Sequence, residues 1–275
     1  MMTSVTKKQC KGFTLIELVL VIAILGIISA GFIGVINIGS NVYNNVSNRD
    51  ELISDARFVV ERLNRELRDA LPNSIRILAN GTSQCLEFVP IKSNNVYLSL
   101  ATMTDPASDA IEVVKASTPY TFINSDRVVV YPIEANDVYN LSVSKSSLIS
   151  NVDTTTDTNE SSCEPNCDFS WDITLDNPMT FAADSPNNRL FIVAEPVSYC
   201  VINSTLLRKD DQGFLNNQSI YTDGVLMAEH IDVCNGSCLP FSYNSTKAIA
   251  QIDLNFNQNN ETIFFSNGVH ITNVP

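Results

Sequence analysis

Histidine and basic residues are scarce in this sequence. It has two histidines, His230 and His270, and 17 lysines and arginines against 30 aspartates and glutamates in 275 residues. It also lacks a Gly-x-Ser-x-Gly motif and a glycine-rich phosphate loop. Without these patterns the sequence offers no strong catalytic pair, so we do not expect an enzyme. The formal net charge of -13 repels phosphates, which argues against a nucleic-acid partner.

One long apolar run stands near the N-terminus. Between residues 18 and 36 no side chain is charged and only one, a serine, is polar. Because a helix of about this length can cross a hydrocarbon layer, we expect a transmembrane span over about 18–36. A secretory signal peptide fits less well, because its small-residue cleavage site follows its apolar core, whereas Gly12 precedes this run. Glu17 lies near the start of the run, where a carboxylate is costly, and this position predicts a function.

The residues around Glu17 form a specific pattern. The stretch KGFTLIELVLVIAILGIISA, residues 11–30, resembles the N-terminal signature of type IV prepilins and of the pseudopilins of type II secretion. The resemblance implies that a prepilin peptidase removes the leader 1–12 by cleaving between Gly12 and Phe13, and that the new amine of Phe13 is methylated. It also implies that the Glu17 carboxylate neutralises the N-terminal amine of a neighbouring subunit inside a filament, where an unpaired charge is costly.

A second helical pattern follows the apolar run and ends at Pro72. Its apolar residues recur at helical spacing, and oppositely charged residues stand four positions apart. We therefore predict one N-terminal helix over 13–71, whose second half lays an apolar stripe under a globular domain. Four glycines in and after the apolar run make bends in this helix plausible. The predicted apolar stripe consists of Leu52, Ala56, Val59, Val60, Leu63, Leu67 and Leu71.

Beyond Pro72 the sequence favours short strands. Runs rich in branched and aromatic residues alternate with Asn, Asp, Gly, Ser and Pro, and no strand–helix alternation is present. We predict an α+β fold, in which the long N-terminal α-helix packs on an antiparallel β-sheet head domain over 72–275. The polar stretch 142–172 is expected to be a surface excursion. The strand-like runs are 74–78, 85–91, 95–100, 127–133, 189–202, 248–256, 262–267 and 269–274.

Six of the seven cysteines follow the apolar run, and only Cys10 precedes it. An even number beyond a membrane segment suggests disulfides in an oxidising compartment. Six cysteines allow 15 pairings, which sequence does not resolve. We favour two short loops and one long link between strands, which the entropic model makes the most stabilising of the three. The favoured pairs are Cys163 with Cys167, Cys234 with Cys238, and Cys85 with Cys200.

The C-terminal part carries a second resemblance. VSYCVINSTLLRKD, GVLMAEHIDVCNGSCLPFSY and IDLNFNQNNETIFFSNGVHITNVP resemble the end of the J-class minor pseudopilins. ARFVVERLNRELRDALPNS and CLEFVPI are most similar to MshO-type minor pilins of the mannose-sensitive haemagglutinin (MSHA) pilus. The resemblance implies a single-pass protein of the bacterial inner membrane, with its head in the periplasm and a place at the pilus tip. The implied partners are other minor pilins, the major pilin, the prepilin peptidase and the inner-membrane assembly platform.

No cofactor is expected, with calcium as the one alternative. Asp153, Asp157, Asn159 and Glu160 could supply oxygen ligands, and the major pseudopilins of type II secretion bind calcium in a loop. Their spacing does not match the alternating oxygens of an EF-hand.

The sequence as a whole predicts a non-enzymatic minor subunit. Cleavage after Gly12 leaves 275 minus 12, or 263 residues, and a head of about 200 residues would crowd a repeating filament. We therefore expect a role in the initiation or tip assembly of an MSHA-type pilus. Two alternatives stay open: a minor pseudopilin of type II secretion, and a tip adhesin that binds a surface ligand through its acidic insert.

Overall fold

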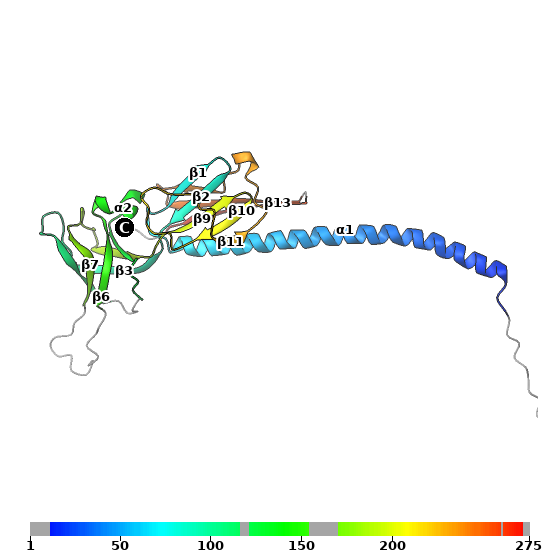
Figure 1. The fold of residues 1–275 in the computed structure, drawn as a ribbon, viewed down its shortest axis with the longest axis horizontal. Coiled ribbons are helices and arrows are strands. Elements are labelled where there is room, and N and C mark those ends of the chain that lie inside the picture. The colour runs from blue at the N-terminus through cyan, green and yellow to red at the C-terminus, as the bar shows by residue number, and fades with distance from the viewer. Residues whose placement is uncertain (1–11, 116–120, 154–169, 260, 272–275) are drawn as a thin grey trace, which may run out of the picture. The chain divides into compact units, whose positions relative to one another are not determined.

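The computed structural model describes residues 12–115, 121–153, 170–259 and 261–271. The chain divides into two compact units, Met1–Glu51 and Leu52–Pro275, and each is described by itself. Helix α1 (Leu15–Arg68) begins in the first unit and ends in the second (Figure 1).

In the first unit the chain is helical from Leu15 onward. The four glycines, which made bends plausible, interrupt nothing: the segment stays α-helical through Gly26, Gly31, Gly34 and Gly39. Its apolar side chains are exposed along the whole predicted span. Helical propensity of the surrounding Leu, Ile and Ala residues therefore outweighs the cost of the isolated glycines.

In the second unit α1 presents a buried apolar stripe. Leu52, Ala56, Val59, Leu63 and Leu67 are at most 1% exposed, and they share one core with residues of two β-sheets. Their spacing of three or four residues places them on one face of the helix. The prediction of a long helix on an antiparallel β-rich head, an α+β fold, is thus confirmed.

Two sheets surround this core. The first has the spatial order β1 (Arg76–Asn80), β2 (Ser83–Phe88), β9 (Val197–Ile202), β10 (Thr205–Lys209) and β11 (Val225–Ala228). The second has the order β12 (Phe241–Asn244), β13 (Ile249–Gln258) and β14 (Glu261–His270). Every pair of neighbouring strands in both sheets is antiparallel.

The remaining strands close into a barrel with a core of its own. Its order is β3 (Ile91–Ser99), β4 (Ser108–Val114), β7 (Ser170–Met179), β6 (Ser146–Asp153), β5 (Arg127–Val130) and β8 (Arg189–Val193). Three short helices complete the described structure: α2 (Ala135–Tyr139), η1 (Leu141–Val143) and η2 (Cys234–Gly236).

The barrel corrects one prediction from the sequence. The stretch 142–172 was expected to be a surface excursion, but its two ends belong to β6 and β7. Ile149, Trp171 and Ile173 point into the barrel and are at most 5% exposed, whereas exposed neighbours such as Ser150 and Asp172 are polar. A strand with one polar face has the composition of a loop, and only its alternation distinguishes it. Strand β4 was missed for the same reason, because acidic and small residues fill its outer positions.

A second correction concerns the C-terminus, where 262–267 and 269–274 were predicted as separate strands. The structure has one strand, β14, that continues through Gly268. Its pairing with β13 runs from Gln258↔Glu261 to Ile249↔His270 without a register shift. Glycine weakens a strand by about 1 kcal/mol or less, and ten paired residues compensate for that.

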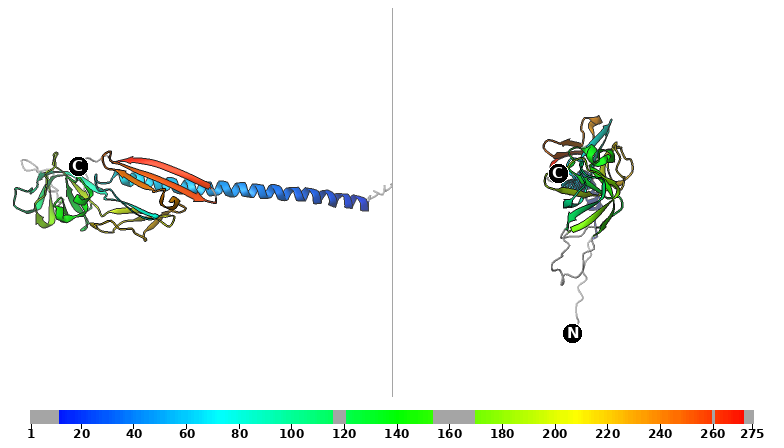
Figure 2. Two further views of the ribbon diagram at one scale, coloured as in Figure 1. Left: turned by 90° about the horizontal axis from the view of Figure 1, so that it is seen from above. Right: turned by 90° about the vertical axis from the view of Figure 1, so that its left-hand side faces the viewer.

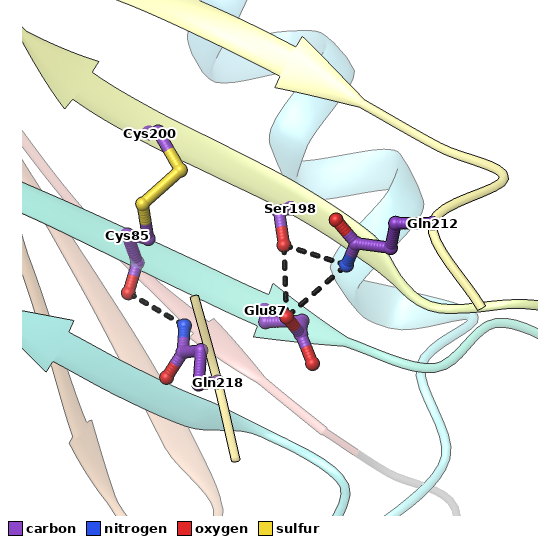
Figure 3. The surroundings of a disulfide bond; sticks show 6 residues. All are labelled: Cys85, Glu87, Ser198, Cys200, Gln212 and Gln218. Carbon is purple, nitrogen blue, oxygen red and sulfur yellow. Dashed lines mark hydrogen bonds between the residues drawn. A yellow bond between two sulfur atoms is a disulfide. The ribbon is translucent and has the colours of Figure 1, made fainter. Parts of the chain in front are cut away.

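A disulfide links two neighbouring inner strands of the five-stranded sheet. Cys85 in β2 and Cys200 in β9 stand directly opposite each other and are joined, as the favoured pairing had them (Figure 3). Both are buried, and the Gln218 side-chain amide donates to the Cys85 carbonyl at 3.1 Å. The loop that carries Gln218 therefore covers the disulfide on one side.

Beside the disulfide lies a buried polar network. The Glu87 carboxylate accepts hydrogen bonds from the Ser198 hydroxyl at 3.0 Å and from the Gln212 side chain at 3.1 Å (Figure 3). It also pairs with Arg76 at 2.6 Å, and the Arg76 guanidinium lies 3.6 Å from the centre of the Tyr139 ring. Burial raises the pKa of Tyr139 well above its usual value, so its hydroxyl stays neutral. The network thus satisfies a buried carboxylate where the sheets meet the barrel.

We predict that the Cys85–Cys200 link stabilises the head far more than the Cys234–Cys238 link. The first closes a separation of 115 residues and the second a separation of four. The entropic model gives about 5 kcal/mol for the long loop and about 2 kcal/mol for the short one. Urea unfolding of the purified full-length protein, followed by β-sheet circular dichroism, measures both. Equal losses in the two double Cys→Ala variants would contradict the prediction.

Candidate functional site

The start of α1 has the geometry of a helix cap. The Thr14 carbonyl accepts hydrogen bonds from the backbone N–H groups of Glu17 at 3.1 Å and of Leu18 at 3.2 Å. The Glu17 N–H also lies 3.4 Å from the Thr14 hydroxyl oxygen, and that hydroxyl lies 3.5 Å from the Glu17 carboxylate. Threonine followed three residues later by glutamate is the sequence of a capping box. Local structure alone therefore gives Glu17 one role, at the electropositive end of a helix.

The helix cap leaves the Glu17 carboxylate available for other contacts. Its one side-chain contact is the long one to Thr14, it is exposed, and it forms no ion pair with any described residue. A carboxylate at this position is ready to pair with a cation from outside the chain. Phe13, whose amine would be the new N-terminus, is also exposed and stands just before the cap.

The apolar side chains after the cap are exposed and are not buried by the described residues of their own unit. Leu15 is 81% exposed and Ile16 75%, and large apolar residues stay exposed through Ile38 and beyond. Within the described residues one helix, α1, is long and apolar enough to cross a membrane. Each such side chain gains about 2 kcal/mol when it leaves water, so this surface requires a bilayer or other apolar helices.

Residues 7–33 match the model of the prokaryotic N-terminal methylation motif. The chain carries this motif. It covers the predicted cleavage site, the cap and the first part of the apolar segment, which supports a subunit of the type IV pilin or pseudopilin kind. The motif implies processing by prepilin peptidase and assembly with other pilins, and with the apolar helix it fits an inner-membrane-anchored subunit. Neither a curated protein nor a solved structure matches the chain.

The other candidate residues belong to the second unit by sequence. Cys234, the first residue of η2, forms a disulfide with Cys238, while Cys163 and Cys167 lie outside the described residues. Asp153 ends β6, and the other three proposed calcium ligands, Asp157, Asn159 and Glu160, also lie outside the described residues. Among the residues that are described, no group of three or more His, Cys, Asp or Glu is placed to hold a metal. The calcium site therefore stays a prediction.

A groove in the head was not predicted. Its volume is about 660 Å³, and it lies between the end of α1 and the end of β14. The side chain of Asn267 donates to that of Asn64 across it. No local pattern marks it, because its two walls are some two hundred positions apart in the sequence. Its lining consists of Asn64, Arg68, Asp69, Asn267, Gly268, Val269 and His270.

A smaller hollow near the barrel is occupied by its own ion pairs. Lys92 pairs with Asp126 at 2.7 Å, and Arg208 pairs with Asp210 at 2.5 Å. Two further carboxylates line the hollow. The paired groups bind each other, so they are part of the architecture of the head.

We predict that the chain loses residues 1–12 in cells that contain a prepilin peptidase. The product should begin at a methylated Phe13 and contain 275 minus 12, or 263 residues. Intact mass measured with and without the peptidase gene, on reduced and non-reduced protein, tests this and counts the disulfides. A chain that retains Gly12 despite an active peptidase would contradict it.

Proposed function

We propose that this protein is a minor subunit that takes part in initiating the tip of an MSHA-type type IV pilus. The methylation motif at residues 7–33 is the observation that carries the proposal, because it specifies processing and entry into a helical fibre. The similarity of the segment 56–74 and of the C-terminal segments to minor pilins supports the finer assignment. On this proposal the head lies in the periplasm before assembly and at the tip afterwards.

The size of the head favours a minor role over that of the main building block. The unit Leu52–Pro275 contains two sheets and a closed barrel beside the end of α1. Subunits that repeat along a fibre must fit between neighbours on every side, whereas a subunit at the end of a fibre has one free side. An added barrel is tolerated more easily at such a position. The proposed role is structural, and subunits of this kind are generally non-enzymatic.

In this role Glu17 acts between subunits. Its carboxylate stands one helical turn from Phe13, exposed and without an ion pair among the described residues. In a bundle of apolar helices it pairs with the N-terminal amine of the next subunit. Water is absent there, so the pair fixes the register of the two helices and a missing partner is costly. The proposed neighbours are other minor pilins and the major pilin, received from the inner-membrane platform.

The J-class resemblance at the C-terminus favours one second candidate, a minor pseudopilin of type II secretion. The processing and the role of Glu17 are the same in both cases. Deleting the gene distinguishes them, because it stops pilus formation in the first case and protein export in the second.

The adhesin alternative needs a narrower deletion than the sequence suggests. Removing the whole polar stretch also removes β6, one of the six strands of the barrel. Replacing only 154–169 by a short linker keeps β6 and β7. Loss of attachment with intact pili would favour the adhesin.

We predict that Glu17→Gln leaves the protein processed and membrane-bound but lowers its incorporation into fibres by about tenfold. Glutamine preserves the capping arrangement and removes the charge. Thr14→Ala is the matched control, because it removes the cap hydroxyl and keeps the carboxylate. Immunoblots of sheared fibres and of membranes measure both pools. Equal incorporation of Glu17→Gln and wild type would remove the intersubunit role from Glu17.

A further inference from the structure

In the part of the chain that the structure describes, β14 is an edge strand that pairs on one side. It pairs with β13, and the Ile271 N–H donates to the Ala248 carbonyl at 2.8 Å. Because backbone directions alternate along a strand, the odd-numbered residues of β14 bond to β13 and the even-numbered residues face outward. None of the outward-facing residues makes a backbone hydrogen bond on that side with the described part of the chain. They are Thr262, Phe264, Ser266, Gly268 and His270.

The other edges of the two sheets are short or protected. At β12 the Gln84 side chain accepts from the Phe241 N–H at 2.8 Å and donates to the Phe241 carbonyl at 2.9 Å. Strand β1 has five residues, and β11 has four with a register shift in its pairing. Strand β14 has ten residues and no proline, lysine or bulge. Proteins normally blunt such an edge, because it pairs readily with other chains.

We propose that β14 is the docking edge for an extended strand of a different subunit in the same fibre. An extended backbone matches outward N–H and C=O groups that recur at every second residue, whereas a helix has no free row of such groups. The identity of the partner rests on the proposed function, whereas the edge position of β14 follows from its strand pairing alone.

The side chains along β14 specify the chemistry of the partner strand. Phe264 is 63% exposed on the outer face, whereas at Gly268, four residues later on the same face, the Gln251 side chain already fills the space that a side chain would take. A partner strand therefore needs an apolar residue that packs on the Phe264 ring and a polar residue near Gln251.

The groove beside α1 adds room at the end of this edge. Its volume is about 660 Å³, and Gly268 and His270 line it together with Arg68 and Asp69. Figure 2 shows α1 beside the long strands β13 and β14. Side chains of an added strand can enter the groove, where charges of both signs favour polar groups on that half of the strand.

A second copy of this chain is the less favoured occupant. Cleavage removes Lys7, Lys8 and Lys11, so 14 basic residues remain against 30 acidic ones. The side chains of each mature subunit therefore carry a formal net charge of -16. Two such copies repel each other. A subunit at a fibre tip also has neighbours of other kinds.

Ser266→Pro in the full-length protein, expressed in the producing bacterium, tests the edge. Proline removes an outward N–H that β13 does not use. The control Ser266→Ala keeps that N–H and loses the same side-chain hydrogen bond, in which Gln251 donates to Ser266 at 2.9 Å. We expect Ser266→Pro to lower the amount in sheared fibres by about tenfold relative to Ser266→Ala, with equal processed protein in membranes.

Amide hydrogen exchange over 261–271 provides the second measurement. The outward amides should exchange more slowly in native membranes or fibres than in the purified protein in detergent. Equal exchange in all three samples would overturn the proposal, and so would equal incorporation of the proline and alanine variants. If wild-type protein is processed but absent from fibres, the proposed function is wrong. Amide exchange in membranes then still tests whether a strand docks on β14. A dimer of purified protein that Ser266→Pro abolishes would overturn the choice of partner.

Discussion

The arrangement of this protein depends on an apolar helical surface that its own unit leaves uncovered. About two dozen mostly large apolar side chains of α1 stand exposed, from Leu15 onward. At about 2 kcal/mol each, their transfer out of water outweighs the few kcal/mol that stabilise an ordinary domain. On the proposed function, the chain passes from one apolar environment to another, first the bilayer and then the interior of a fibre. In the last third of the same helix the apolar side chains are covered by the chain itself, because Leu52, Val59 and Leu63 are buried under two sheets.

The Glu17 carboxylate at the start of α1 has a local role as a helix cap and, on the proposed function, a second role between subunits. Thr14 and Glu17 cap the helix locally, which explains why a glutamate is tolerated at the edge of an apolar segment. A local role does not compete with an external one, because the cap contact is long and leaves the charge without a cation in the described structure. On the proposed function, this one residue caps the start of α1 within the chain and sets the register between helices in a fibre.

Local periodicity made part of this structure predictable. The buried stripe of α1 followed from helical spacing, and the Cys85–Cys200 pairing agreed with two strand-like runs around the cysteines. Strands β6 and β7 were missed because Ser, Asn and Asp fill their outer faces and resemble a loop in composition. The free edge of β14 and the groove next to Asn64 were beyond prediction, since both depend on how distant segments pair. The sequence therefore predicts which face of a helix or strand is buried, but not which distant segments pack against it.

The Cys85–Cys200 bond has a mechanical consequence. All six barrel strands, from Ile91 to Val193, lie between these two cysteines in the sequence. A pull transmitted along the backbone from α1 to the C-terminal strands reaches Cys85 first and can continue through the sulfur bridge into Cys200. The barrel then lies in a covalently closed loop that does not transmit the force. It can loosen, or change its length over evolution, without lengthening the covalent path between α1 and the C-terminal strands.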